Sequence, residues 1–255
     1  MDSPRSARSP LDEAALQDAA GPGWRVRLHA EAGSTNALAA AAPEDDLVVV
    51  ADHQQAGRGR LDREWVTPPG AALTFSAVVD PGLEIERWPL LPLVTGYAVA
   101  RAIGGFATLK WPNDVLVDGL KVCGILIEGV AAHPSLAVLG IGINVDQTQA
   151  ELPVPTATSL ELAGHPIDRT RLFGDVLGSL QASLGHLVRH PDLFANQYRD
   201  RSATLGRDVR VELAGDRSVE GRAVDIDAVG RLVLETADGT LTLSAGDVVH
   251  LRLPE

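Results

Sequence analysis

The sequence predicts an α+β fold, in which a core of helices and a mixed β-sheet is followed by a small C-terminal β-barrel. Two observations lead to this prediction. Up to about residue 203, short apolar segments typical of buried strands are interspersed with longer helical patterns. From about residue 204, short strand-like segments alternate with Gly or Asp turns, which is typical of a small barrel.

In the core, apolar alternation or short apolar runs predict strands at 24–30, 47–51, 71–79, 109–111, 115–117, 122–127 and 136–145. Longer patterns predict helices at 11–20, 34–40, 88–103, 168–188 and 191–202. Ser34 suits the cap of the second helix, and Pro89 and Pro92 suit the first turn of the third. Asp118-Gly119 is a hairpin signal between two of the strands.

The barrel strands are expected at 209–213, 219–224, 232–235, 240–243 and 248–251. The pattern divides the chain into three parts. Residues 1–23 are expected to form a flexible N-terminal segment, 24–203 the main domain and 204–255 a C-terminal domain.

Composition narrows the class of protein. The 255 residues are 45% hydrophobic, enough to bury a sizeable core. With 22 basic and 34 acidic residues the formal charge is −12, which disfavours a DNA-binding protein. Cys123 is the single cysteine, and the sequence has neither a signal-type apolar run at its start nor a membrane-length one. We therefore expect a cytoplasmic protein that binds neither DNA nor a membrane.

A loop at 54–63 is rich in glycine and arginine. Gly57 and Gly59 let the backbone approach a ligand closely, and Arg58 and Arg60 add planar cations suited to phosphate or carboxylate. The alternative is a surface turn with two solvated arginines, and this loop alone leaves the two interpretations about equal.

Two lysines lie beside apolar strands. Lys110 precedes Trp111-Pro112, and Lys121 begins an apolar strand directly after the hairpin turn. Lysine is seldom buried without a partner, so an inward-pointing lysine needs an anion. The alternative, which Lys121 alone favours, is an edge residue facing water.

Strand glycines at 124, 140 and 142 mark either a bulge or the close approach of a ligand. Asn113-Asp114 can orient phosphate or metal, although ordinary turn chemistry is the preferred interpretation. Asn144 either contacts a nucleotide or ends its strand, and Trp65 either stacks on a base or packs in the core.

Several site classes are not visible. The seven histidines and one cysteine show no zinc-ligand spacing, and neither a Walker A motif nor a Gly-x-Ser-x-Gly motif occurs. We therefore expect no metal held directly by protein ligands.

In order and spacing, the segments closely resemble the catalytic core of biotin protein ligases. The resemblance covers about residues 25–251 and rests on Gln54-Gln55-Ala56-Gly57-Arg58-Gly59-Arg60, Lys110-Trp111-Pro112-Asn113-Asp114 and Lys121-Val122-Cys123-Gly124-Ile125-Leu126-Ile127-Glu128. It implies a core akin to class II aminoacyl-tRNA synthetases and an SH3-like C-terminal barrel. It also implies that biotin reacts with ATP, with Mg²⁺ carried by the nucleotide, to give biotinyl-5′-AMP.

The resemblance implies that biotin is then transferred to a lysine of a biotin carboxyl carrier protein, and that the enzyme is a monomer or weak homodimer. Lys121 and Arg58 are the implied catalytic residues. Those implied to bind biotin are Ser34, Thr35, Gln54, Arg58, Lys121, Gly124 and Gly142. Those implied to contact the nucleotide or adenylate are Arg60, Trp65, Asn144, Asn113 and Asp114.

Two departures from the family pattern stand out. Leu61-Asp62-Arg63 follows the second loop arginine where the family often continues Arg-Gly-Arg, so Asp62 puts the closed shape of the loop in question. The residues before the core are too few for the N-terminal DNA-binding domain of some members, so we expect the short form. A lipoate-type ligase and a biotin-sensing regulator with little catalysis remain as alternatives.

Overall fold

A computed structural model describes residues 8–60, 63–65, 67–215 and 217–251. Within these ranges the larger sheet has seven strands in the order β1-β2-β5-β9-β8-β7-β6. They are β1 (Arg25–Ala32), β2 (Leu47–Gln54), β5 (Ala72–Val79), β6 (Thr108–Lys110), β7 (Asp114–Val117), β8 (Leu120–Val130) and β9 (His133–Asn144). β1 and β2 run parallel and the other neighbours antiparallel, which confirms the predicted mixed sheet.

The helices also follow the sequence pattern. They are α1 (Glu13–Ala20), α2 (Thr35–Ala41), α3 (Leu90–Ile103), α4 (Arg169–Arg189) and α5 (Pro191–Asp200), with short 3₁₀ turns η1 (Ile85–Arg87) and η2 (Gln149–Glu151). Ser34 caps α2 by accepting from the Ala37 amide, as predicted. The hairpin signal is confirmed: β7 and β8 pair across Asp118 and Gly119, whose φ values are 50° and 77°.

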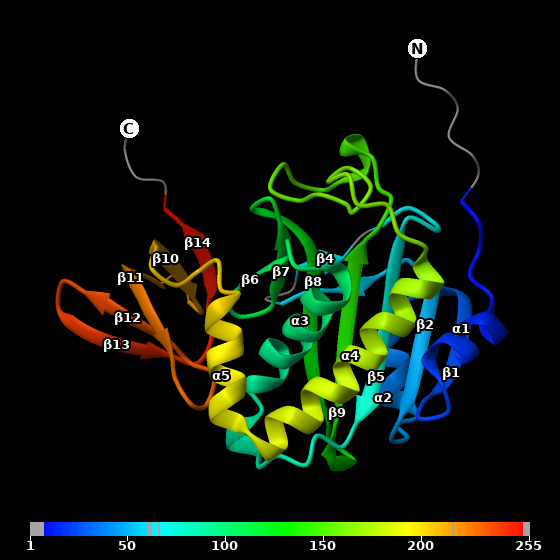
Figure 1. The fold of residues 1–255 in the computed structure, drawn as a ribbon, viewed down its shortest axis with the longest axis horizontal. Helices are drawn as coiled ribbons and strands as arrows, with labels where there is room; N and C mark the ends of the chain where they lie inside the picture. Colours follow the sequence, from blue (N-terminus) through cyan, green and yellow to red (C-terminus); the bar gives the residue numbers. More distant parts are fainter. Residues whose placement is uncertain (1–7, 61–62, 66, 216, 252–255) are drawn as a thin grey trace.

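The sheet is covered on both faces. Figure 1 shows α3 and α4 lying across one face, and α4 also packs against α1. Val48 and Val50 of β2 point into this larger core. Leu47 and Val49 alternate with these residues along the strand. They belong to a second cluster with Ala39 of α2, since successive strand residues face opposite sides. The α2 side therefore has the smaller apolar cover, and polar groups collect there.

The N-terminal segment is packed onto the core from residue 8, whereas the sequence predicted a flexible segment through residue 23. Asp12 caps α1, and Leu16 is fully buried. The Arg8 side chain is also anchored, by carboxylates far along the chain. The sequence showed no sign of the Arg8 contacts, because their partners lie more than a hundred residues away.

The C-terminal strands form a separate antiparallel sheet in the order β13-β12-β11-β10-β14. They are β10 (Asp208–Leu213), β11 (Arg217–Ile226), β12 (Leu232–Thr236), β13 (Gly239–Leu243) and β14 (Asp247–His250). Among the described residues no strand pairing joins β13 to β14, so the SH3-like sheet is not closed by hydrogen bonds.

This sheet is docked on the core. The Trp111 indole N–H donates to the Gly230 carbonyl at 3.0 Å, and Arg199 of α5 pairs with Asp225 at 2.6 Å. Figure 1 shows the smaller sheet on the side of the molecule where α5 and β6 lie. The two domains therefore meet near the segment that contains Trp111. No helix in the described ranges is long and apolar enough to cross a bilayer.

Candidate active site

The predicted site residues gather on the α2 side of the larger sheet and along one of its edges. Strands β5, β8 and β9 provide the floor, the start of α2 borders it, and the two-stranded ribbon of β3 (Gly57–Arg58) and β4 (Glu64–Trp65) lies over it. Leu61 and Asp62, on which the expected change in loop shape depends, lie outside the described residues. The ribbon itself is described, and it places both Arg58 and Trp65.

A chain of neutral hydrogen bonds lies at the floor. Gln54 Oε1 accepts from the Thr35 amide at 2.9 Å and lies 3.2 Å from the Thr35 hydroxyl. Ser76 Oγ lies 2.7 Å from Thr35 Oγ1 and 2.6 Å from Asn36 Oδ1. A hydroxyl has a single proton, so Ser76 donates to the Asn36 oxygen and accepts from Thr35.

This chain ends on a charged pair. Asn36 Nδ2 donates to Glu128 Oε2 at 2.6 Å, and Arg58 Nη2 contacts the same oxygen at 3.3 Å. The Arg58 side chain stays 52% exposed. One continuous network therefore connects the buried Gln54 to the solvent-facing Arg58, and it holds the amide and hydroxyl groups in fixed orientations. We name its uncharged members, Thr35, Asn36, Gln54 and Ser76, the neutral network.

The strand glycines Gly124 and Gly142 leave space above the sheet, and the Trp65 ring occupies that space. A Cβ on Gly142 would lie 2.6 Å from the Trp65 ring, and one on Gly124 would lie 3.0 Å from it. A Cβ on Gly140 would instead meet the Asn36 amide oxygen at 2.2 Å. These glycines are therefore required by close neighbours rather than by bulges. The Trp65 indole nitrogen is buried without a hydrogen-bond partner among the described residues.

A charged cluster lies at the edge beyond the glycines. Lys121 Nζ is 2.5 Å from Asp114 Oδ1, and Lys110 Nζ is 3.9 Å from Asp114 Oδ2. Burial lowers the pKa of Lys110, partly offset by Asp114. Asp114 is thus the anion that an inward-pointing lysine requires, and neither lysine is a simple surface residue.

The Lys121 backbone is held from both sides. Its amide donates to the Thr156 carbonyl, and its carbonyl accepts from the Thr158 amide, both at 2.8 Å. The side chain lies over Gly124, and its Nζ is 5.9 Å from the centre of the Trp65 ring. Arg58 contacts the same strand through Glu128, so the two predicted catalytic cations lie along one strand with Trp65 between them.

Arg60 and Arg63 connect the loop to the C-terminal sheet. Arg60 Nη1 donates to Asn113 Oδ1 and to the Gly246 carbonyl, both at 3.3 Å. Arg63 forms an ion pair with Asp247, the first residue of β14. Asn113 in turn donates to the Ile125 carbonyl at 2.8 Å, so it also braces β8. The sequence pattern gave no sign that these loop arginines reach the second domain.

Asn144 ends β9, as one of its two interpretations expected. Its Nδ2 donates to the Thr158 carbonyl at 3.0 Å, and its Oδ1 accepts from Gln147 at 2.9 Å. The side chain is 5% exposed. Asn144 therefore fixes the segment that also holds Lys121, whatever ligand contacts it makes.

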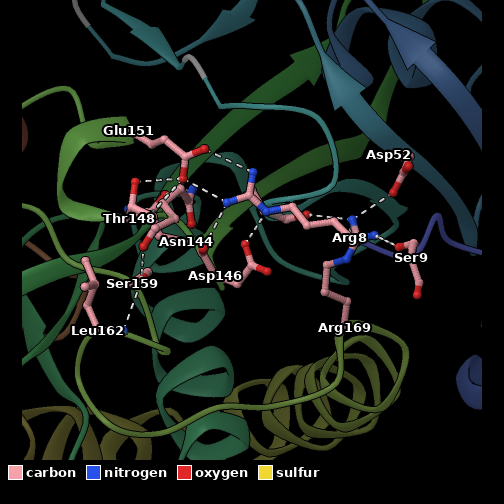
Figure 2. Close-up of polar contacts among 12 residues, drawn as sticks. Arg8, Ser9, Asp52, Asn144, Asp146, Thr148, Glu151, Ser159, Leu162 and Arg169 are labelled. Carbon is pink, nitrogen blue, oxygen red and sulfur yellow. Dashed lines mark hydrogen bonds and ion pairs between the residues drawn. The ribbon is translucent and has the colours of Figure 1, made fainter. Parts of the chain in front are cut away.

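Figure 2 shows how the N-terminal segment is fastened beside Asn144. Arg8 donates to both carboxylate oxygens of Glu151, at 2.8 and 3.2 Å, and to Asp146 Oδ1 at 2.5 Å. The Arg8 hydrogen bond is the main reason that the pKa of Glu151 falls to about 2. Arg169 pairs with Asp52 at 2.7 Å and donates to the Ser9 carbonyl. Arg8, Ser9, Asp146 and Arg169 all border a cavity of about 400 Å³.

Sequence reasoning missed Asn36, Ser76, Glu128 and Asp247. Ser76 had a visible signal, because it is a hydroxyl within a strand whose residues are all buried. A buried polar side chain usually has hydrogen-bond partners, so it points to a network. Asp247 had no such signal, since an acid at a strand start near the surface is ordinary.

Comparisons with known proteins agree with this architecture. Residues 32–146 match the model of the biotin/lipoate A/B protein ligase family, and residues 204–251 match that of the biotin protein ligase C-terminal domain. A biotin–[acetyl-CoA-carboxylase] ligase of Mycobacterium tuberculosis is 41% identical, over 96% of this chain and 97% of that protein. The bifunctional ligase/repressor BirA of Bacillus subtilis is 34% identical, over 81% of this chain and 66% of its own length.

Solved structures give the same result. The Aquifex aeolicus biotin protein ligase in complex with biotin and ATP superposes with a TM-score of 0.77 and 29% identity, covering 89% of this chain and 99% of that one. The Leishmania major enzyme in complex with biotinyl-5-AMP has a TM-score of 0.58 and 26% identity, covering 88% and 100%. Sequence, fold and site together show that this chain belongs to the biotin protein ligase family.

Proposed function

We propose that the chain is an ATP-dependent biotin–[biotin carboxyl carrier protein] ligase. The carboxylate of biotin attacks the α-phosphate of ATP, which gives biotinyl-5′-AMP and releases pyrophosphate. The amine of a carrier lysine then attacks the acyl carbon, so that an amide forms, AMP leaves and a proton is released. The observation that carries the proposal is that the neutral network and the Lys121 cluster both lie beside the glycines of β8 and β9.

The neutral network suits the ureido head group of biotin. A ureido group presents both donors and acceptors, and a buried polar ligand requires preoriented partners. Gln54 and Thr35 supply an amide and a hydroxyl at the end of the network, and Ser34 lies directly before Thr35. Gly124 and Gly142 leave space for the ligand once the Trp65 ring has moved away.

The charged cluster suits the reacting end. Lys121 is the proposed catalytic cation, because adenylation builds negative charge on the α-phosphate and a fixed cation beside it lowers the barrier. Arg58 balances the biotin carboxylate, and Arg60 holds the loop over the adenylate. Trp65 stacks on the adenine after it leaves the glycine floor, and Asn113, Asp114 and Asn144 line the nucleotide side.

Mg²⁺ is proposed to arrive with ATP. This ion commonly binds through substrate phosphates and one or two carboxylates rather than an all-protein cage. Asp114 lies at the proposed nucleotide side, where its carboxylate would help to position the phosphate-bound ion. When bound, the ion would offset phosphate charge, while Lys121 and Arg58 orient the reacting groups.

The proposed partner is a biotin carboxyl carrier protein or domain of a biotin-dependent carboxylase, and the proposed location is the cytoplasm. The biotin–[acetyl-CoA-carboxylase] ligase name of the Mycobacterium tuberculosis relative supports the carrier class. The single buried Cys123 is in keeping with a reducing compartment. We further propose a monomer or weak homodimer that binds neither DNA nor a membrane.

Biotin-dependent exchange of labelled pyrophosphate into ATP tests the proposal. Exchange by the purified chain with biotin, and none without it, is the expected result. Exchange with lipoate instead would indicate the lipoate-type alternative, which the family model leaves open by its name. Biotin binding without exchange would indicate a sensor with little catalysis. Labelling of a carrier lysine completes the test.

A further inference from the structure

Asp247 connects the smaller sheet to the loop over the active site. Its Oδ2 pairs with Arg63, and its Oδ1 lies 3.6 Å from Arg60 Nη1. The preceding Gly246 offers its carbonyl to the same Arg60 nitrogen. The C-terminal domain thus holds two loop arginines through one carboxylate and one carbonyl.

The contact is well suited to fixing a side chain. The Asp247 side chain is 13% exposed and that of Arg60 is 22% exposed, so water screens this pair less than a surface pair. Gly246 has φ of 152°, and a Cβ there would lie 2.4 Å from Val211 Cγ1. The backbone that presents both acceptors is therefore held by close packing on β10.

Arg60 also faces the catalytic domain. Its guanidinium contacts Asn113, and Arg60 lines a cavity of about 160 Å³ together with Trp111 of the core and with Gly230 and Ser244 in loops of the C-terminal domain. Both domains therefore determine where this guanidinium lies. A loop of glycines and arginines lacks packing of its own, so it requires such outside anchors.

We propose that Asp247 is a positioning residue for adenylation: it holds the guanidinium groups of Arg60 and Arg63 beside the proposed nucleotide side of the site. This inference rests on the proposed function. Asp247 touches no substrate, so its loss should affect the use of ATP and the retention of the adenylate rather than the binding of biotin by the neutral network.

Asp247→Asn tests the proposal because it removes the charge and keeps the shape. In biotin-dependent pyrophosphate exchange we expect the KM for ATP to rise about tenfold, the change that roughly 1.4 kcal/mol produces. The Kd for biotin, measured by calorimetry, should stay within about twofold of the original value. Asp247→Glu should restore part of the loss. Glu220→Gln is the matched control, because it breaks the exposed Arg210–Glu220 pair in the same sheet without touching the loop.

A double variant separates positioning from a purely structural role. In an Arg60→Ala, Arg63→Ala background, Asp247→Asn should add little to the rise in KM, because its partners are already gone. An unchanged KM in the single variant, or an equal further rise in the double background, would overturn the inference. So would a parallel loss of biotin affinity and melting temperature. Absence of exchange in the unmodified chain would instead overturn the proposed function itself.

Discussion

The two halves of the candidate active site differ in burial and in charge. The neutral network is almost fully buried, and amide and hydroxyl groups dominate it. The charged cluster at Lys121 is partly exposed and depends on ion pairs, and the loop arginine Arg63 adds an ion pair that crosses to the C-terminal domain. A neutral ligand head requires fixed donors and acceptors, whereas a developing phosphate charge requires cations. The loop at 54–60 joins them, with Gln54 in one and Arg60 in the other.

The largest effect is expected from a substitution that disrupts the charged half of the site alone. Lys121→Ala should lower the turnover number for biotin-dependent pyrophosphate exchange by about a thousandfold, because a fixed cation is worth most in the charged transition state. Biotin affinity should fall far less, since the neutral network remains. Calorimetry and exchange assays on the same preparation check both. Normal turnover would show that Lys121 is not the catalytic cation.

A substitution in the neutral half should instead weaken biotin binding more than it lowers turnover. Gln54→Ala leaves the Thr35 amide without its side-chain acceptor, and an unpaired buried polar group costs about 1–3 kcal/mol. We expect the Kd for biotin to rise about 10–100-fold, with a smaller change in turnover at saturating biotin. Gln55→Ala is the control, because Gln55 contacts only the exposed Glu31 in the described side-chain hydrogen bonds. Equal effects of the two variants would contradict the prediction.

Trp65 lies close to both halves, because its ring covers Gly142 and Gly124 and is near Lys121. Its ring covers Gly142 and Gly124, the space proposed for biotin, so biotin has to displace it. Trp65→Ala should therefore tighten biotin binding by roughly three- to tenfold, while it raises the KM for ATP through loss of stacking. Trp88→Phe is a control far along β8, where Trp88 packs on Gly129. Weaker biotin binding in Trp65→Ala would show that the indole supports the ligand instead of competing with it.

The smallest expected effect concerns stability. Burial, then the positive charges of Lys110 and Arg207, lower the pKa of His250 to about 4 from 6.5. The folded state therefore binds fewer protons than the unfolded state between these pH values. The resulting stability is complete above about pH 6.5 and is lost as the pH falls toward 4, by roughly 1–3 kcal/mol. Denaturant titrations at pH 7 and pH 4.5 should show a smaller loss in His250→Gln, and an equal loss would contradict this prediction.

Much of the fold could be predicted from the sequence because its signals are local. The Asp118-Gly119 hairpin, the Ser34 cap and the proline-led helix at Leu90–Ile103 are each set by a few adjacent residues. The loop arginines and Lys121 were also found, through their residue types and the family pattern. Their expected roles remain predictions until they are measured.

The missed residues depend on contacts across the chain. Arg8 meets Glu151 at a separation of 143 residues, and Arg60 meets Gly246 at a separation of 186. No periodicity encodes such pairs, because only the folded topology brings them together. Trp65 illustrates a different gap: its residue type indicated a stacking surface, but not that the ring lies over Gly124 and Gly142.

The fastening of Arg8 has a practical consequence for recombinant work. A truncation past this residue would remove the guanidinium that links Asp146 and Glu151 to the N-terminal segment, beside the end of β9. Loss of these hydrogen bonds would loosen the strand end that carries Asn144 and braces the Lys121 segment. An expression version intended for assays should therefore begin upstream of Arg8, and a cleavable tag should leave that arginine in place.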